Sequence, residues 1–170
     1  MTEIEVPLET SQEHIQHAAL HASDSDKKFM NMGAIIAALL AVAAAVSALF
    51  AGHMANEALL EQIQASNKWA YYQAKGIKAS IAEMKAGENS DKVAKYKEQQ
   101  EEISKEAQEK ERESQHHLLQ HESLAAAVTF FQIAIAITAI AVLTRKRSFF
   151  FGSIGLGLLG LVWIAKGLVR

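Results

Sequence analysis

Seven histidines are the residues of this chain whose spacing best fits binding chemistry. His14, His17 and His21 lie three and four residues apart, so a helix near the N-terminus would place them on one face. Two imidazoles at positions i and i+4 of a helix can share a transition-metal ion. A closed site normally needs a carboxylate or a thiolate as well, and a polar stripe on an amphipathic helix is the simpler interpretation.

A second histidine group lies near the middle of the sequence. His117 and His121 again have the i, i+4 spacing, and His116 precedes them. His53 lies near the end of an apolar stretch, and a helical hairpin between residues 53 and 121 would bring the two to the same level. The candidate metal ligands are therefore His14, His17, His21, His53, His117 and His121. Such histidines could also respond to pH, because an imidazole changes its protonation near neutral pH. The alternative is that they bind no ligand.

The rest of the sequence contains no signature of catalysis. No G-x-S-x-G, H-E-x-x-H or P-loop pattern occurs, and there is no cysteine. We therefore predict no catalytic residue and no cofactor, and we do not expect an enzyme. The formal net charge is −2, which argues against nucleic acid as a partner, because nucleic acid requires a concentrated basic surface.

Three long stretches of the chain carry no Asp, Glu, Lys or Arg. They cover residues 29–56, 123–144 and 148–165. An apolar helix of roughly 20 residues spans the hydrocarbon core of a bilayer, and only a helix satisfies its own backbone polar groups there. We predict three transmembrane helices over these ranges. Residues 1–28 form a polar, amphipathic N-terminal segment that does not resemble a signal peptide, because it begins with acidic residues.

Residues 57–122 are polar and rich in Ala, Glu, Lys and Gln, which favour helix. The Gly-Glu-Asn-Ser sequence at 87–90 divides this stretch into two arms of equal length, which predicts an antiparallel helical hairpin outside the membrane. We expect one apolar seam in each arm to face the other arm. The first seam holds Leu59, Ile63, Ala70, Ile77 and Met84, and the second holds Val93, Tyr96, Ile103 and Ala107. The predicted fold class is an all-α membrane protein with three transmembrane helices and a long protruding hairpin between the first and the second.

The basic residues predict the orientation. Arg145, Lys146 and Arg147 form the short turn between the last two apolar stretches, and Lys27 and Lys28 precede the first. Basic short loops favour the cytoplasmic side of a membrane. We predict a multi-pass protein of the inner (cytoplasmic) membrane, with a cytoplasmic N-terminus and an extracytoplasmic hairpin.

Small and aromatic residues predict contacts between copies of the chain. Small residues four apart allow transmembrane helices to approach closely, and Trp and Tyr are common anchors of interfaces. Packing within one chain is the alternative for both groups. The predicted oligomer interface comprises Gly33, Ala37, Ala41, Trp69, Tyr71, Tyr72, Ser153 and Gly157.

The segment W-A-Y-Y-Q-A-K at residues 69–75 is the most distinctive of the chain. Together with Asn56-Glu57-Ala58-Leu59 after an alanine-rich apolar helix, and with two closing apolar stretches, it resembles the bacterial domain-of-unknown-function 4337 family. The resemblance extends from about Phe29 to the C-terminus. It implies a bacterial multi-pass membrane protein, and it implies no activity, cofactor or catalytic residue.

The leading functional hypothesis is a homo-oligomeric membrane protein with a structural or scaffolding role. A channel lined by the alanine-rich or the glycine-rich helix is the first alternative, and a metal- or pH-responsive sensor that uses the histidine clusters is the second. The expected partners are membrane lipid and other copies of the chain; the sequence identifies no other protein partner.

Overall fold

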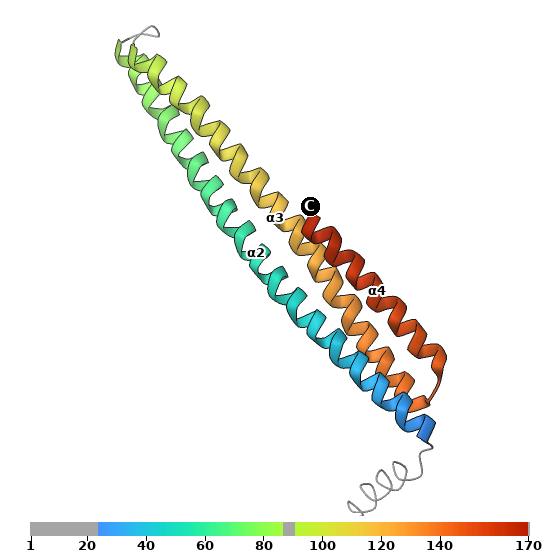
Figure 1. The fold of residues 1–170 in the computed structure, drawn as a ribbon. Helices are drawn as coiled ribbons and strands as arrows, with labels where there is room; N and C mark the ends of the chain where they lie inside the picture. The colour runs from blue at the N-terminus through green and yellow to red at the C-terminus, as the bar shows by residue number, and fades with distance from the viewer. Residues whose placement is uncertain (1–23, 87–90, 170) are drawn as a thin grey trace, which may run out of the picture.

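The computed structural model describes residues 24–86 and 91–169, and these residues form three α-helices (Figure 1). Helix α2 extends over Asp24–Ala86, α3 over Asp91–Thr144 and α4 over Arg147–Val169. Within the described ranges there is no strand, so the predicted all-α class is confirmed for this part of the chain. The N-terminal segment with His14, His17 and His21 lies outside the described residues.

Helix α2 continues without interruption through 63 residues. Alanine is its commonest residue and it contains no proline, so nothing in its sequence breaks the hydrogen-bond ladder. Asp24 and Asp26 lie in the first turn and Lys85 in the last, where their charges complement the helix dipole. The helix therefore passes directly from its apolar residues to its polar ones near residue 56.

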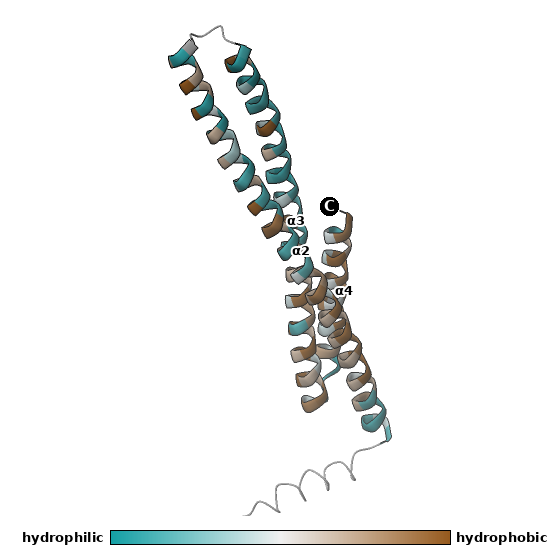
Figure 2. Ribbon diagram, turned by 90° about the vertical axis from the view of Figure 1, so that its left-hand side faces the viewer, coloured by the Kyte–Doolittle hydropathy of each residue, from teal (hydrophilic) through white to brown (hydrophobic). Residues whose placement is uncertain are grey.

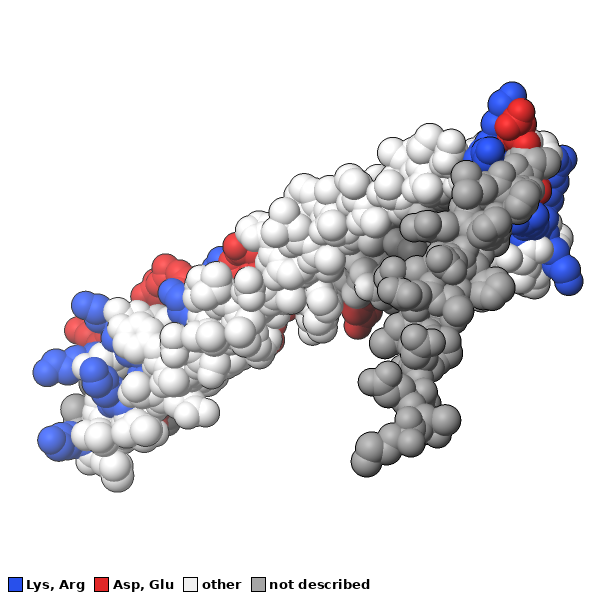
Figure 3. Space-filling view, turned by 90° about the horizontal axis from the view of Figure 1, so that it is seen from below, with Lys and Arg blue, Asp and Glu red and all other residues white. Residues whose placement is uncertain are grey.

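The molecule divides along its length into an apolar half and a polar half (Figure 2). The apolar half comprises residues 29–56 of α2, residues 123–144 of α3 and all of α4; the polar half comprises residues 57–86 and 91–122. Each of the three helices contains a segment long and apolar enough to cross a membrane. Figure 3 shows Lys and Arg side chains at both ends of the molecule: at the end where α2 begins and α3 meets α4, and, together with acidic side chains, at the far end of the polar half.

Helices α2 and α3 lie side by side over most of their length (Figure 1). Their contacts pair residues in opposite order, because residue numbers fall along α3 as they rise along α2. Hydrogen bonds join Gln100 to Tyr72, Ser114 to Ala58, and His121 to Ala51. The ion pairs Lys97–Glu83, at 2.8 Å, and Lys110–Glu61, at 3.0 Å, follow the same order in the polar half.

Alanines at one position of a seven-residue repeat are buried on the face of α2 that packs against α3; the half-buried Tyr72 occupies that position between Ala65 and Ala79. We call this the inner face; its members are Ala44, Ala51, Ala58, Ala65 and Ala79, each at most 8% exposed. A repeat of seven keeps one face of a helix against its partner along a left-handed supercoil. Because alanine is small, the backbones of α2 and α3 can approach each other closely at these positions.

The predicted first seam is wrong, whereas most of the second is confirmed. In α3, Val93, Ile103 and Ala107 are buried, and Tyr96 is half-buried. In α2, however, Ile77 is 62% exposed and Met84 is 80% exposed, and Leu59, Ile63 and Ala70 are exposed as well. The alanines lie on the opposite side of α2 and are buried against α3 instead, so the larger residues remain on the surface.

Helix α4 packs mainly on α3 through small residues. A Cβ atom on Gly160 would lie 2.7 Å from the Phe131 ring, so glycine is needed for this approach. Phe131 is 1% exposed and forms a buried cluster with Ala44 and Ala127. The turn from α3 to α4 passes through Arg145, whose φ of 55° ends α3 in the left-handed conformation.

Candidate functional site

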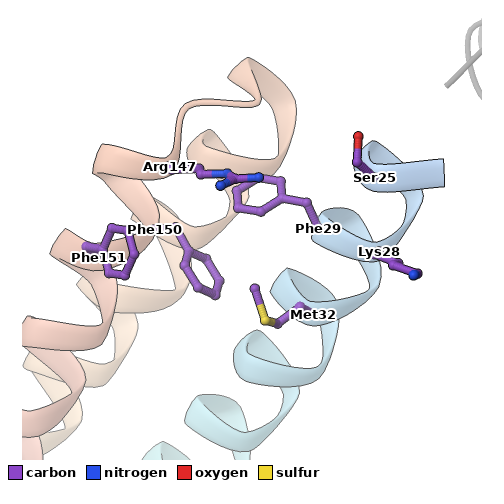
Figure 4. A pocket seen from close by; sticks show the side chains of 7 residues that line it. All are labelled: Ser25, Lys28, Phe29, Met32, Arg147, Phe150 and Phe151. Atoms are coloured by element: carbon purple, nitrogen blue, oxygen red, sulfur yellow. The ribbon is translucent and has the colours of Figure 1, made fainter. Parts of the chain in front are cut away.

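A groove lies between the start of α2 and the start of α4, at the basic end of the molecule (Figure 4). It measures about 540 Å³. Its walls are mostly apolar and its rim carries two cations; the lining residues are Ser25, Lys28, Phe29, Met32, Arg147, Phe150 and Phe151. In Figure 4 the side chains of Phe29, Met32 and Phe150 lie between α2 and α4, whereas the Lys28 side chain points away from α4.

The geometry around this groove is held by contacts between α2 and the turn before α4. The Arg145 guanidinium donates to Asp26 at 3.1 Å. The rings of Phe29 and Phe150 lie 5.4 Å apart between centroids, in a tilted arrangement that favours aromatic pairs. These contacts gather the basic residues of the turn and those of the first turns of α2 at one end of the molecule.

Among the described histidines, the rings of His116 and His117 lie 5.7 Å apart between centroids, and His121 contacts the backbone of α2. The His121 Nδ1 lies 2.8 Å from the Ala51 carbonyl oxygen, to which a protonated Nδ1 donates. His53 is exposed, and His117 lies 3.3 Å from the Gln120 amide oxygen. Within residues 24–86 and 91–169, no three His, Cys, Asp or Glu residues are placed to hold a metal ion. The predicted equal level of His53 and His121 agrees with the His121–Ala51 contact.

The aromatic patch of α2 belongs largely to the contact with α3. The Trp69 indole N–H donates to Glu111 Oε1 at 2.8 Å, and the Trp69 and Tyr72 rings meet edge to face at 5.5 Å. Tyr71 is half-exposed, with the Lys75 ammonium 5.1 Å from its ring centroid. Of the three predicted interface aromatics, Tyr71 is therefore the one that presents most surface to another molecule.

The predicted small-residue contacts fall mostly inside one chain. A Cβ on Gly33 would lie 2.5 Å from Val142 Cγ2, and one on Gly157 would lie 2.9 Å from Leu40 Cδ2. Ser153 is fully buried and its hydroxyl donates to the Phe150 carbonyl at 2.8 Å. Ala37 is half-buried, whereas Ala41 is exposed. Close packing thus uses Gly33, Ser153 and Gly157 within the chain.

Charged groups of the polar half join α2 to α3. Lys110 lies 3.0 Å from Glu61 and 2.7 Å from Glu113, and Lys68 pairs with Glu106. Hydrogen bonding to Glu113, and then to Glu61, raises the pKa of Lys110 above its ordinary range. The same hydrogen bond lowers the pKa of the Glu113 carboxyl. These ionisable groups hold the two helices in register.

The sequence interpretation missed the inner face and the groove. The signal for the inner face was the repeat of seven in alanine, which a search for large apolar residues overlooks. The signal for the groove was weaker, because Lys28 and Arg147 lie 119 positions apart in the sequence and only the fold brings them together.

Comparison with known proteins places the chain in a family. The sequence pattern described as "Domain of unknown function (DUF4337)" matches residues 29–90 and 85–170. No curated protein and no solved structure matches the chain significantly. The resemblance predicted from the W-A-Y-Y-Q-A-K segment is confirmed, and the chain belongs to the DUF4337 family.

Proposed function

We propose that this protein is a homo-oligomeric integral membrane protein with a structural, scaffolding role and without enzymatic activity. In this proposal the apolar half lies in the inner membrane of a bacterium and crosses it three times. The polar half is then an antiparallel helical hairpin outside the membrane, and each arm projects on the order of 48 Å at 1.5 Å per residue.

The distribution of basic residues supports an orientation. Lys27, Lys28, Arg145, Lys146 and Arg147 belong to the same end of the apolar half, because Arg145 pairs with Asp26. Positively charged residues next to membrane helices favour the cytoplasmic side. We therefore propose that this end, with the N-terminal segment, is cytoplasmic and that the hairpin is extracytoplasmic.

Exposed apolar residues of the polar half carry the proposal of an oligomer. Leu60, Ile63, Ile77, Ile81 and Met84 are each more than 40% exposed in a part of α2 that the proposal places in water. Lipid cannot cover them there, and a soluble surface rarely presents so many large apolar residues on one helix. Contact with other copies of the chain would remove these side chains from water.

The chemistry of the polar half supports a structural role over an enzymatic one. Its best-defined ionisable groups, Glu61, Lys110 and Glu113, are engaged with one another across the two helices. The Trp69 indole is likewise engaged with Glu111. Groups that hold two helices together in this way stabilise the hairpin rather than meet a substrate.

The groove at the basic end supports membrane lipid as a partner. Lys28 and Arg147 lie at its rim and aromatic rings form its wall. An anionic phospholipid of the cytoplasmic leaflet has a negatively charged head group to bind the two cations and acyl chains to lie against the aromatic rings. Such a lipid would anchor the basic end of the scaffold at the membrane surface.

A measurement of mass tests the proposed function. The full-length protein, purified in mild detergent and transferred to lipid nanodiscs, is expected to give a mass corresponding to two or more copies. Native mass spectrometry and light scattering provide independent values. A monomer in both environments, over a range of protein concentration, would contradict the proposal.

A further inference from the structure

The exposed apolar residues of α2 follow a regular pattern along almost the entire helix. From Met32 to Met84, positions at alternating intervals of three and four residues are all exposed. We call this set the outer stripe. It comprises Met32, Ile35, Leu39, Val42, Val46, Leu49, His53, Asn56, Leu60, Ile63, Asn67, Ala70, Ala74, Ile77, Ile81 and Met84.

The outer stripe concentrates the exposed apolar surface of α2. Of the fifteen large hydrophobic residues of this helix that are exposed, eleven belong to the stripe, and Phe50, Leu59 and Tyr71 lie directly beside it. The apolar members continue beyond the apolar half as Leu60, Ile63, Ile77, Ile81 and Met84. Contact with lipid explains such a surface only as far as the membrane extends.

The spacing of the stripe points to a helix as its partner. Intervals of three and four residues give an average period of 3.5, the heptad repeat of helices that wind around one another. A helix of period 3.6 would drift by about 20° in each heptad, so a stripe kept over more than fifty residues needs a supercoiled partner. The buried alanines of the inner face follow the same repeat of seven, with Tyr72 between Ala65 and Ala79, so the inner face and the outer stripe stay on opposite sides of α2 along its length.

We infer that the outer stripe is covered by the outer stripe of a second copy of this chain, with the two α2 helices parallel and in register. This inference rests on the proposed function. Copies inserted into one membrane in the same orientation have each residue at the same depth. Parallel pairing therefore sets every stripe residue beside its counterpart, with apolar residues facing apolar residues in both halves of the molecule.

The distribution of charge is compatible with this pairing. No residue of the outer stripe is charged. Lys78 and Lys85 flank the outer stripe in the polar half. In a parallel pair they would face Gln73 and Ser80 of the other copy, so no lysine would face another lysine. The acids Glu61 and Glu83 instead form ion pairs with α3, at 3.0 and 2.8 Å.

Polar stripe residues and the size of the surface support a specific contact. Asn67 occupies the heptad position at which a single asparagine fixes register, because it hydrogen-bonds with its counterpart only when the helices are aligned. The stripe and its flanking positions together amount to roughly 20–30 residues on each copy, the size of a standard protein–protein interface.

Disulfide cross-linking tests the inference directly, because the natural chain has no cysteine. Single substitutions Leu60→Cys, Ile63→Cys, Ile77→Cys and Ile81→Cys place one thiol in the stripe of the full-length protein. Gln62→Cys, next to Ile63 but off the stripe, and Lys105→Cys, on the exposed side of α3, are the matched controls. All variants are oxidised in lipid nanodiscs or native membranes and separated without reductant.

We expect covalent dimer at the stripe positions in at least tenfold excess over both controls. Equal yields at stripe and control positions would overturn the inference, as would the absence of dimer at every stripe position. The mass of each uncrosslinked variant separates the two proposals. A monomer contradicts the proposed function and the inference together, whereas an oligomer without stripe cross-links contradicts the inference alone and leaves the oligomeric scaffold in place.

Discussion

The inner face and the outer stripe of α2 lie on opposite sides of one helix and differ in the size of their residues. The inner face consists of alanines at one heptad position, with Tyr72 between two of them, and is buried against α3, whereas the outer stripe is mostly Leu, Ile, Val and Met and is exposed. In an ordinary helical hairpin the large residues would be buried and the small ones exposed. The reversal indicates that contact within the chain depends on close approach, and that the large apolar side chains serve a contact outside the chain.

The same leucine substitution on the two sides of α2 should have opposite effects. Ala65 is fully buried on the inner face and Ala70 is exposed on the outer stripe. Ala65→Leu overpacks the contact with α3 and should lower the free energy of unfolding by about 1–3 kcal/mol. Ala70→Leu should leave the fold intact and strengthen self-association. Thermal unfolding followed by circular dichroism in detergent measures the first effect; equal losses from both variants would contradict the distinction.

A charge in the outer stripe should separate the copies without unfolding the chain. Ile77→Asp removes a side chain whose burial contributes about 1.5–3 kcal/mol and sets a carboxylate against its counterpart in the other copy. We expect the dissociation constant of the oligomer to rise at least tenfold while helicity is retained. Lys105→Asp introduces the same carboxylate on α3 and should leave association unchanged. An unaltered dissociation constant for Ile77→Asp would show that the stripe is not the interface.

Removal of one hydrogen bond should affect the contact inside the chain more modestly. The buried Ser114 hydroxyl donates to the Ala58 carbonyl at 2.8 Å. Ser114→Ala removes the donor that α3 supplies to that carbonyl, which keeps its own helical hydrogen bond, and should cost about 1 kcal/mol of unfolding free energy. Ser104, whose hydroxyl accepts a longer bond of 3.4 Å from Gln108 at the surface, provides the control. Equal unfolding temperatures of the Ser114→Ala and Ser104→Ala variants would contradict the importance of the inner contact.

The smallest expected effect concerns pH. Because hydrogen bonding from Lys110 lowers the pKa of Glu113 in the folded protein, this carboxylate stabilises the fold above its unfolded pKa. The stabilisation is lost as pH falls through the folded pKa. We expect the unfolding temperature of the natural protein to decline between about pH 5 and about pH 3, and that of Glu113→Gln to decline less. Parallel curves for the two proteins would exclude this contribution, which is modest because the group is exposed.

The composition of the chain was sufficient to predict its helices, because stretches without charge and without proline leave few other structures possible. The three apolar stretches follow from the distribution of charge along the sequence. The predicted division at residues 87–90 lies outside the described residues, and it agrees with the end of α2 at Ala86 and the start of α3 at Asp91. The second seam was also predictable, since Val93, Ile103 and Ala107 are apolar residues in a polar helix.

The first seam and the groove were harder to predict, for two physical reasons. In α2, large and small apolar residues occupy opposite faces, and periodicity alone does not reveal which face a neighbouring helix will cover. Ala58 and Ala65 are buried because the backbones of α2 and α3 can approach each other at these positions. This close approach depends on both helices, so the sequence of one helix does not reveal it. The groove is formed by residues of α2 and α4. These residues lie close together only because α3 returns the chain to the end of the molecule where α2 begins.

Distances between copies at Ser66, Gln73 and Ser80 test the central claim most directly. These exposed positions lie one heptad apart beside the outer stripe, so a spin label on a cysteine at each reports the alignment of two α2 helices. Pulsed dipolar spectroscopy of each single variant in nanodiscs should give one intermolecular distance, the same at all three positions. Distances that differ along the helix by amounts on the order of 20 Å, as an antiparallel arrangement requires, or the absence of an intermolecular distance, would contradict parallel pairing through the outer stripe.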